Sequence, residues 1–370
     1  MKPKVLFILH FPPPVHGAAM VGQFIKRSNI INENFDTAYI NLSTSTTVNE
    51  VGKGGINKII STCKLAAKVI RALSKVNYDL CYMTLTAKGF GYYKDFIIVV
   101  ILKIFRKTII YHFHNKGVST RQQNTLDNLL YKFTFNATKS ILLSSLLYTD
   151  ISKYVDRKDI FVCGNGIPEI ENKVLTEKEA VDSNDRCKLL FLSNMVVEKG
   201  VLVLLEACKL LKEKNLNFEC HFVGDWASVT EEMFNELISE NNLSKYIFAH
   251  GKKYNDEKLY FYNSADIFVF PTFYHNECFP LVLLEAMQFN LPIVSTNEGG
   301  IAEIISDGIT GFIVPQNNSR ELAEKLELLI ENKELRLQMG KAGRLRFQNK
   351  YTLNHFENCL SDALKKALPS

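Results

Sequence analysis

Two glutamates stand eight positions apart in the stretch "NECFPLVLLEAM", Glu277 just before Pro280 and Glu285 inside the apolar run that follows. Ionised glutamate is rarely buried without a partner, so each is expected to face a cleft or a ligand. Pro280 suits the first position of a helix because its missing N–H is not needed there. Glu277 then lies in the preceding loop, Glu285 about a turn and a half into the helix, and the amide of Leu281 points into the same cleft.

A lysine at a second helix start offers the positive charge that a phosphate needs. Lys199 precedes Gly200 in "NMVVEKG", so an ammonium and free backbone amides converge on one spot that suits a diphosphate. Carboxylates would repel phosphates, so we expect Glu277 to hold hydroxyls of a transferred sugar and Glu285 a ribose diol. A solvated lysine and a glutamate that only caps a helix remain open alternatives.

Glycines and histidines follow several other predicted strands. Gly17 opens a helix after the first strand, Gly224 ends "FECHFVG", and Lys252 follows the strand after that. In "YHFHNKG", the alternation of a strand points His112 and His114 to the same side. We expect His114, nearer the strand's end, to lie in the site, and His112 to be a satisfied polar residue beneath a loop.

Other motifs exclude some function classes. No glycine fingerprint of the G-x-G-x-x-G type follows a strand correctly, which disfavours a dinucleotide-dependent oxidoreductase. The 8 cysteines include no Cys-x-x-Cys pair, a usage that fits a reduced compartment better than disulfides or a zinc site. The start, "MKPKVLFILHFPPP", imitates a signal peptide, but its apolar run is short and ends at His10. We therefore expect a buried first strand.

Strand-length apolar runs alternate with helical patterns throughout the chain. Expected strands are residues 4–9, 36–42, 78–85, 108–114, 188–193, 218–224, 247–251, 267–272 and 292–296. Expected helices are residues 18–29, 57–74, 95–105, 201–214, 230–241, 257–264, 281–289 and 352–368. This order predicts an α/β protein with two Rossmann-like, doubly wound parallel-sheet domains, whose ligands bind beyond the carboxyl ends of the strands.

The alternation of strands and helices restarts after the polar stretch from Glu169 to Arg186, which suggests a domain boundary there. We expect an acceptor-side domain over residues 1–170 and a nucleotide-sugar-binding domain over 171–350. Residues 351–370 are expected to form a helix, and the pattern leaves open whether it returns to the first domain.

Charge differs between the two halves. Residues 1–170 carry 22 Lys and Arg against 10 Asp and Glu, whereas residues 171–370 carry 22 against 29. A basic half predicts an anionic partner, and scattered basic residues without a binding motif disfavour nucleic acid. A phospholipid surface or a phosphorylated lipid fits better, although solubility alone would also explain the charge. The apolar residues 96–105 are too few to span a bilayer, so they form a buried helix or one that also touches a membrane surface.

These motifs together carry a family resemblance. The run from Ala265 to Pro315, which contains "NECFPLVLLEAM" and "NLPIVSTNEGGIAEIISDGITGFIVP", resembles the signature of retaining glycosyltransferase family 4. Shorter stretches such as "PPPVHGAA", "HFHNKG", "GNGIP", "VVEKG" and "FVGDW" lie in the family's order along nearly the whole chain. The resemblance implies the GT-B fold, in which two Rossmann-like domains face a cleft. It also implies transfer of a sugar with retention of configuration, without a metal and without another cofactor.

The resemblance also implies residue roles. His114 and Glu277 are expected beside the transferred sugar as the catalytic residues. The expected donor-binding residues are Gly17, Lys199, Gly224, Lys252, Phe279, Pro280, Leu281 and Glu285. One departure concerns the triplet Ser193–Asn194–Met195, where family members usually carry an arginine that helps to neutralise the diphosphate. Lys252 or Lys253 could replace that charge.

The expected activity is transfer of a sugar from a nucleotide-sugar donor, UDP-linked rather than GDP-linked, to a glycan or polyprenyl-diphosphate-linked glycan. Such a reaction would serve the synthesis of bacterial surface polysaccharide, lipopolysaccharide or capsule. We expect a cytoplasmic enzyme, peripheral at the inner membrane. Two alternatives are a catalytically lapsed scaffold of the same fold and an enzyme that isomerises nucleotide sugars, such as a 2-epimerase.

Overall fold

A computed structural model describes residues 1–13, 16–43, 56–170 and 186–369 of the chain. The chain forms two compact units, which we call unit 1 (Met1–Gly166 with Leu353–Ser370) and unit 2 (Ile167–Thr352). The first residue of unit 2 lies beside its last ones, because the amide of Ile167 donates to the carbonyl of Tyr351 at 3.1 Å. None of the helices in the described ranges has the length and apolarity needed to cross a bilayer.

Unit 1 is built on a sheet of six parallel strands in the order β2-β1-β3-β4-β5-β6. The strands are β1 (Lys4–Leu9), β2 (Asp36–Asn41), β3 (Leu80–Thr84), β4 (Ile109–His112), β5 (Lys139–Leu142) and β6 (Ile160–Val162). Every residue of β3 and β4 is buried, which explains their continuous apolar sequences, since a parallel sheet is covered on both faces.

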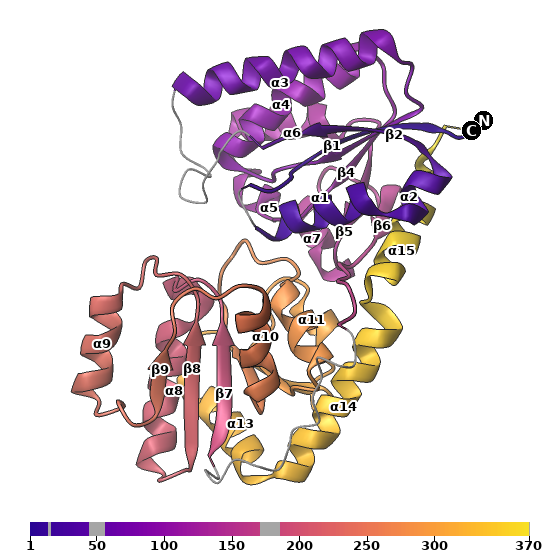
Figure 1. The fold of residues 1–370 in the computed structure, drawn as a ribbon. Helices are drawn as coiled ribbons and strands as arrows, with labels where there is room; N and C mark the ends of the chain where they lie inside the picture. The colour runs from indigo at the N-terminus through magenta and orange to yellow at the C-terminus, as the bar shows by residue number, and fades with distance from the viewer. Residues whose placement is uncertain (14–15, 44–55, 171–185, 370) are drawn as a thin grey trace. The chain divides into compact units, whose positions relative to one another are not determined.

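Helices cover both faces of this sheet (Figure 1). They are α1 (Gly17–Arg27), α2 (Asn29–Asn34), α3 (Ile56–Lys75), α4 (Gly89–Ile104), α5 (Val118–Arg121), α6 (Thr125–Phe135), α7 (Tyr148–Ile151) and α15 (Leu353–Ala367). One face carries α1, α2 and α15, and the other carries α3, α4 and α6.

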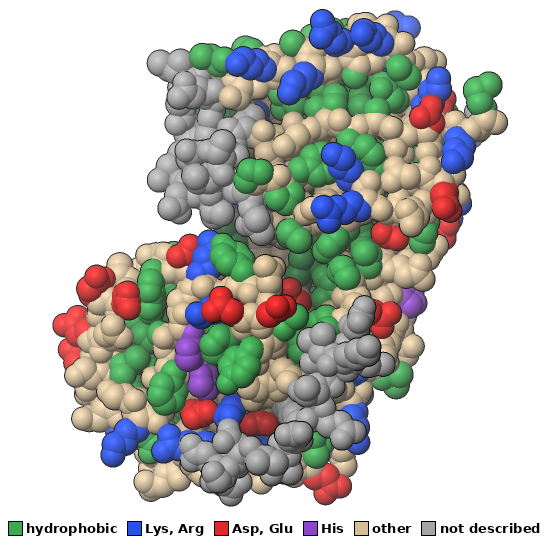
Figure 2. Space-filling model, viewed as in Figure 1, with side chains coloured by type: hydrophobic (Ala, Val, Ile, Leu, Met, Phe, Trp, Pro, Cys, Tyr) green, Lys and Arg blue, Asp and Glu red, His purple; other side chains and the backbone are tan. Residues whose placement is uncertain are grey.

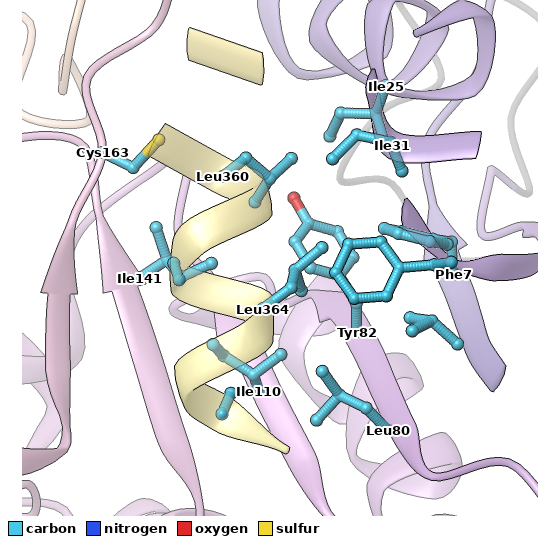
Figure 3. Close-up of a cluster of buried hydrophobic side chains, with 14 of the residues drawn as sticks. Phe7, Ile25, Ile31, Leu80, Tyr82, Ile110, Ile141, Cys163, Leu360 and Leu364 are labelled. Carbon is cyan, nitrogen blue, oxygen red and sulfur yellow. The ribbon is translucent and has the colours of Figure 1, made fainter. Parts of the chain in front are cut away.

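The C-terminal helix α15 completes the core of unit 1. Leu360 and Leu364, one turn apart, point into a cluster with Phe7 of β1 and Tyr82 of β3 (Figure 3). Both leucines are fully buried, which by area burial stabilises the fold by roughly 1.5–3 kcal/mol each. An amphipathic helix that is 186 residues away in sequence from the rest of unit 1 therefore fills the gap between β1, β3 and β4.

Unit 2 repeats the architecture with a sheet of six parallel strands in the order β12-β11-β10-β7-β8-β9. The strands are β7 (Cys187–Leu192), β8 (Phe218–Val223), β9 (Ile247–Ala249), β10 (Ile267–Phe270), β11 (Ile293–Thr296) and β12 (Gly311–Val314). The helices are α8 (Val201–Glu213), α9 (Glu231–Glu240), α10 (Asn255–Ser264), α11 (Leu281–Gln288), α12 (Ile301–Ile304), α13 (Ser319–Glu331) and α14 (Lys333–Lys350).

Several elements differ from the sequence-based expectation. The single helix expected over 18–29 is followed at once by a second helix, because Ser28 ends α1 and its hydroxyl accepts from the amide of Ile31 at 3.1 Å to start α2. The helix expected over 95–105 begins earlier, at Gly89. The pattern also missed two strands and three helices of unit 1 (β5, β6, α5, α6, α7) and one strand and three helices of unit 2 (β12, α12, α13, α14). The missed strands have only three or four residues, too few for a clear period.

Candidate active site

Lys199 is held by a tight turn between β7 and α8. It ends a short 3-10 helix, Val197–Lys199, and Gly200 follows with a φ of 90°. A Cβ on Gly200 would lie 2.2 Å from the carbonyl oxygen of Pro271, at the end of β10. Only glycine combines this left-handed backbone with so close an approach. The turn thus fixes the lysine beside the neighbouring strand.

The ammonium of Lys199 forms an ion pair with the carboxylate of Glu277. The two side chains are only 18% and 13% exposed, so the pair is partly withdrawn from water. The ammonium also lies 4.4 Å from the centre of the Tyr274 ring, a distance at which the ring's negative face attracts a cation. Lysine and glutamate, 78 positions apart in the sequence, therefore meet as one charged group.

The loop that carries Glu277 is anchored at both ends. Its first part is tied to the lysine turn, since the amide of Phe273 donates to the carbonyl of Glu198 at 2.8 Å. Its second part is held by the amide of Gly300, which donates to Cys278 at 2.7 Å. Gly299 has a φ of 58°, and a Cβ there would lie 2.3 Å from the carbonyl oxygen of Glu277. These contacts hold the carboxylate in place before any ligand binds.

The loop ends at α11, with one correction to the expected helix start. Pro280 precedes the first helical residue, Leu281, and has an extended ψ of 120°; it is the capping residue and not the first residue of the helix. The side chain of Phe279 is buried and packs edge-on against Tyr351 at 5.8 Å. Any contact of Phe279 with a donor would therefore use its backbone. The amide of Leu281 belongs to the first turn of α11, where amides lack partners within the helix.

Glu285, in the second turn of α11, is oriented by two residues of α10. One carboxylate oxygen pairs with Lys258 at 2.7 Å, and the other accepts from the hydroxyl of Tyr262 at 2.7 Å. Burial and the nearby carboxylate raise the pKa of Tyr262 well above its usual value, so the hydroxyl stays a donor. Neither Lys258 nor Tyr262 was expected from the sequence. A Lys and a Tyr four positions apart share one helix face, but nothing local pairs that face with α11.

The ends of β7, β8 and β9 meet closely at Gly224. A Cβ there would lie 1.7 Å from the carbonyl oxygen of Ser193, and the Gly224 amide donates to Gly251 at 2.9 Å. The absence of a side chain is thus required by packing alone. Lys252 pairs with Asp225 at 3.1 Å. Asn194 itself is exposed.

The cations considered as substitutes for the usual arginine are both engaged with carboxylates. Besides the pair of Lys252 with Asp225, Lys253 pairs with Glu257 at 3.0 Å. Neither lysine is therefore an unbalanced positive charge that could simply replace an arginine at position 194.

In unit 1, histidines gather at the ends of β1 and β4. The rings of His112 and His114 lie 4.3 Å apart, as strand alternation predicts. His112 is fully buried, with Nδ1 at 2.5 Å from the Tyr82 hydroxyl. Its other ring nitrogen is buried without a hydrogen-bond partner among the described residues, so His112 is only half satisfied. Burial, and then the charge of His16, lower the pKa of His114 to about 3.

Gly17 stands at the first position of α1, beside these histidines in the same unit. A Cβ on Gly17 would meet nothing within 4 Å, so packing does not demand glycine there. Packing does require glycine at position 22, because a Cβ there would lie 2.0 Å from the carbonyl oxygen of His10. His16 caps α1 by accepting from the amide of Ala19 at 3.3 Å. Burial lowers the pKa of His10 and His16 as well.

The expected residues thus form separate groups within the units. Unit 2 joins Lys199 with Glu277 and supports Glu285 from α10, while Gly17 and His114 belong to unit 1. Among the described residues, no group of three or more His, Cys, Asp or Glu is arranged to hold a metal ion. The charged pairs of unit 2 can bind phosphates and hydroxyls, and the neutral histidines of unit 1 can exchange hydrogen bonds with uncharged polar groups.

Most of unit 2 is similar to a known protein family. Residues 174–346 match the family described as glycosyl transferases group 1. This segment is therefore similar to that family. The matched segment contains Lys199, Glu277 and Glu285.

Individual relatives agree with the family. The chain is 31% identical over 236 residues to the capsular polysaccharide biosynthesis glycosyltransferase CapM of Staphylococcus aureus, covering 59% of each chain. It is 30% identical over 145 residues to the putative colanic acid biosynthesis glycosyltransferase WcaL of Escherichia coli, covering 38% of this chain and 35% of the relative. The chain thus spans about three fifths or less of the length of these curated relatives.

Solved structures show that both units together have the GT-B fold. A glycosyltransferase from Rickettsia africae matches with a TM-score of 0.75 at 21% identity, covering 99% of this chain and 98% of that one. Anabaena HepE, solved with UDP and glucose, matches with a TM-score of 0.73 at 16% identity, covering 98% and 100%. WaaG, a lipopolysaccharide glycosyltransferase, matches with a TM-score of 0.68 at 16% identity, covering 97% and 98%. The expected fold class is confirmed.

Proposed function

We propose that the chain is a retaining, metal-independent glycosyltransferase of family 4 that transfers a sugar from a nucleotide-sugar donor. The acceptor is a glycan or a polyprenyl-diphosphate-linked glycan of a bacterial surface polysaccharide. The observation that carries this proposal is the ion pair of Lys199 with Glu277, held by two glycine turns inside the segment that matches the family.

The geometry supports a division of roles in unit 2. An ammonium has three donors, so Lys199 can hold Glu277 with one and meet the donor diphosphate with another. The Glu277 carboxylate would repel phosphate and therefore accepts from sugar hydroxyls. Glu285, oriented by Lys258 and Tyr262, accepts from the ribose diol. The backbone amides at the start of α11, including that of Leu281, complete the anion site.

Unit 1 supplies polar groups without charge in this proposal. His114 with its lowered pKa is neutral near pH 7 and lies beside the transferred sugar, where it exchanges hydrogen bonds with hydroxyls or the leaving oxygen. Gly17, which packing does not require, lets the start of α1 approach the donor or the acceptor. No protein nucleophile is assigned, and the acceptor attacks on the face that the diphosphate leaves.

The relatives guide the choice of donor and acceptor. HepE has been solved with UDP and glucose, and CapM and WcaL are described as enzymes of polysaccharide biosynthesis. A UDP-sugar is therefore the preferred donor, ahead of a GDP-sugar. Such an enzyme would work at the cytoplasmic face of the inner membrane, where lipid-linked intermediates are built.

A thermal-shift panel of UDP-, GDP- and ADP-sugars tests donor binding. The matching donor stabilises the folded chain by RT ln(1 + [L]/Kd), about 2.7 kcal/mol at a hundredfold excess over Kd. Incubation with that donor and a lipid-linked glycan should then release nucleotide only when the acceptor is present. The anomeric configuration of the product, measured by NMR, should match that of the donor; inversion would contradict retention.

A second function is a lapsed enzyme of the same fold that acts as a scaffold, which the exposed Asn194 in place of an arginine favours. A scaffold would release no nucleotide with any acceptor. A 2-epimerase-like enzyme would isomerise the donor, or release nucleotide, without acceptor. The same assay thus separates the three activities.

A further inference from the structure

Three neighbouring helices of unit 1 expose large apolar side chains that the core does not use. On α4, exposed residues recur every seven positions, which is two turns of one helix face; on α6 they follow a spacing of three and then four positions. The exposed apolar residues are Ile59, Ile60 and Ile70 of α3, Phe90, Ile97 and Ile104 of α4, and Leu126, Leu129 and Phe133 of α6. Their exposed fractions range from 42% to 71%.

Each of these helices already has a separate buried stripe. Leu65, Val69 and Leu73 of α3 face the core, as do Ile98 and Leu102 of α4. In α6, Tyr131 and Phe135 are buried. The outward apolar residues are therefore additional to those that fold the unit. A helix that is apolar on its outer side as well is typical of a surface that meets an apolar partner.

Basic side chains accompany the apolar ones on α3. Lys64, Lys68, Arg71 and Lys75 are all exposed, and their spacing of four, three and four positions places them in one row along the helix. Figure 2 shows Lys and Arg side chains beside hydrophobic ones along this part of unit 1. On the neighbouring helices, Lys103 of α4 lies 5.4 Å above the ring of Phe133 of α6.

Carboxylates are withdrawn from the same surface. The sequence of α3 contains no Asp or Glu. The single acid of α4, Asp95, is completely buried, and accepts from the amide of Thr86 at 2.9 Å. The single acid of α6, Asp127, is 2% exposed and is held by Tyr93 and Arg121 at 2.6 Å each. Among their described residues, these helices therefore expose no negative charge.

We propose that the outer face of α3, α4 and α6 docks on an anionic phospholipid bilayer. The nine apolar side chains enter the boundary between headgroups and acyl chains, while the lysines and arginine meet the lipid phosphates. A second copy of this chain fits poorly, because pairing the face with itself would bring rows of like charge together. The benefit of the contact rests on the proposed function, since it would bring unit 1 to lipid-linked acceptors; the binding itself does not depend on sugar transfer.

The first test measures co-sedimentation of the full chain with phosphatidylcholine vesicles that contain either none or about 30% phosphatidylglycerol. We expect binding to the anionic vesicles only, weakened when salt is raised from about 0.1 M to about 0.5 M. Absence of binding to anionic vesicles would overturn the proposal. So would concentration-dependent dimerisation that the changes below abolish, because a second copy would then cover the face.

Variants locate the surface. The triple change Lys64→Glu, Lys68→Glu, Arg71→Glu and the triple change Ile97→Ser, Leu129→Ser, Phe133→Ser should each weaken binding about tenfold or more. Matched controls in unit 2 are Lys333→Glu, Lys341→Glu, Lys350→Glu on α14, and Ile309→Ser with Leu345→Ser, which are 60% and 58% exposed. Controls that weaken binding as much as the face variants would overturn the assignment.

A donor thermal shift measured on the same proteins separates this proposal from the proposed function. Face variants that lose vesicle binding but keep the donor shift support the membrane surface and show that they are folded. Loss of both vesicle binding and the donor shift would show damage to the fold. The single changes Phe133→Ser and Arg71→Glu are then measured instead. Full vesicle binding by both single variants would overturn the proposal. If wild type binds vesicles but no nucleotide sugar, the proposed function fails while the membrane surface stands.

Discussion

Unit 1 and unit 2 have sheets of the same size and the same parallel kind, yet they place different chemistry at the strand ends. Unit 2 carries ion pairs at or just beyond this edge: Lys199 with Glu277, Lys258 with Glu285, and Lys252 with Asp225. Unit 1 carries histidines, and burial lowers the pKa of all four: His10, His16, His112 and His114. The charged groups of unit 2 suit charged ligands, whereas the neutral histidines of unit 1 suit neutral polar ones.

The largest effect should come from breaking the main ion pair of unit 2. Glu277→Ala or Lys199→Ala should lower turnover about a thousandfold or more, because each change removes a contact proposed for the donor and leaves the partner as an uncompensated, partly buried charge. The fold should persist. Turnover and circular dichroism measured on the same purified variants check both parts.

A matched control for this prediction exists in the same unit. Lys214 and Glu327 form a similar ion pair, but it is more exposed, at 48% and 27%, and distant in sequence from the family motif. Glu327→Ala should leave turnover within about twofold, since such surface pairs contribute about 0–1 kcal/mol. Near wild-type turnover in either Glu277→Ala or Lys199→Ala would remove that residue's assigned role.

The neutral histidines predict a stability loss in acid. His114 has a folded-state pKa of about 3 against 6.5 when unfolded, so between these values the unfolded chain binds a proton that the folded chain does not. The contribution of His114 to the free energy of unfolding is therefore complete above pH 6.5. It is lost as the pH falls towards 3. From pH 7 to about pH 5, the loss is up to about 2 kcal/mol.

Urea unfolding at the two pH values measures this loss. In His114→Gln the difference in unfolding free energy between pH 7 and pH 5 should shrink by up to about 2 kcal/mol. His355→Gln, at an exposed position of α15, serves as the control and should behave as wild type. Equal pH dependence in wild type and His114→Gln would mean that His114 is not held neutral.

A positive charge added at position 194 should strengthen donor binding by unit 2. Lys199, Lys252 and Lys258 are each paired with a carboxylate. Asn194→Arg should therefore supply new positive charge and tighten nucleotide-sugar binding about tenfold, or about 1.4 kcal/mol. Calorimetric titration measures the affinity, and neutral Asn194→Gln is the control. Unchanged affinity in Asn194→Arg would place this position away from the diphosphate.

The smallest expected effect is a difference in labelling rate between cysteines of the two units. Cys359 of α15 is exposed, and its hydrogen bond with Cys163 lowers its pKa to about 7. Iodoacetamide at about pH 7.5 should therefore label Cys359 several-fold faster than exposed Cys63. Buried Cys208 and Cys220 of unit 2 should label last. Mass spectrometry of a time course measures the rates, and Cys163→Ala should slow labelling of Cys359.

Much of the fold followed from local patterns. Continuous apolar runs predicted the central strands such as β1, β3 and β7, because strands covered on both faces need no polar alternation. The spacing of Glu277, Pro280 and Glu285 also identified a helix start with two carboxylates. Short edge strands such as β6 and β12 were missed, since three or four residues carry no clear period.

The α/β class, the two similar halves and the residue types available for a site all follow from the sequence alone, because they depend on periodicity and on motifs a few positions long. Which of these residues meet depends on the folded chain. The pairing of Lys199 with Glu277, the support of Glu285 by Tyr262, and the return of α15 to unit 1 all join segments far apart in the chain. Such contacts depend on how sheets and helices pack, and no local pattern encodes that packing.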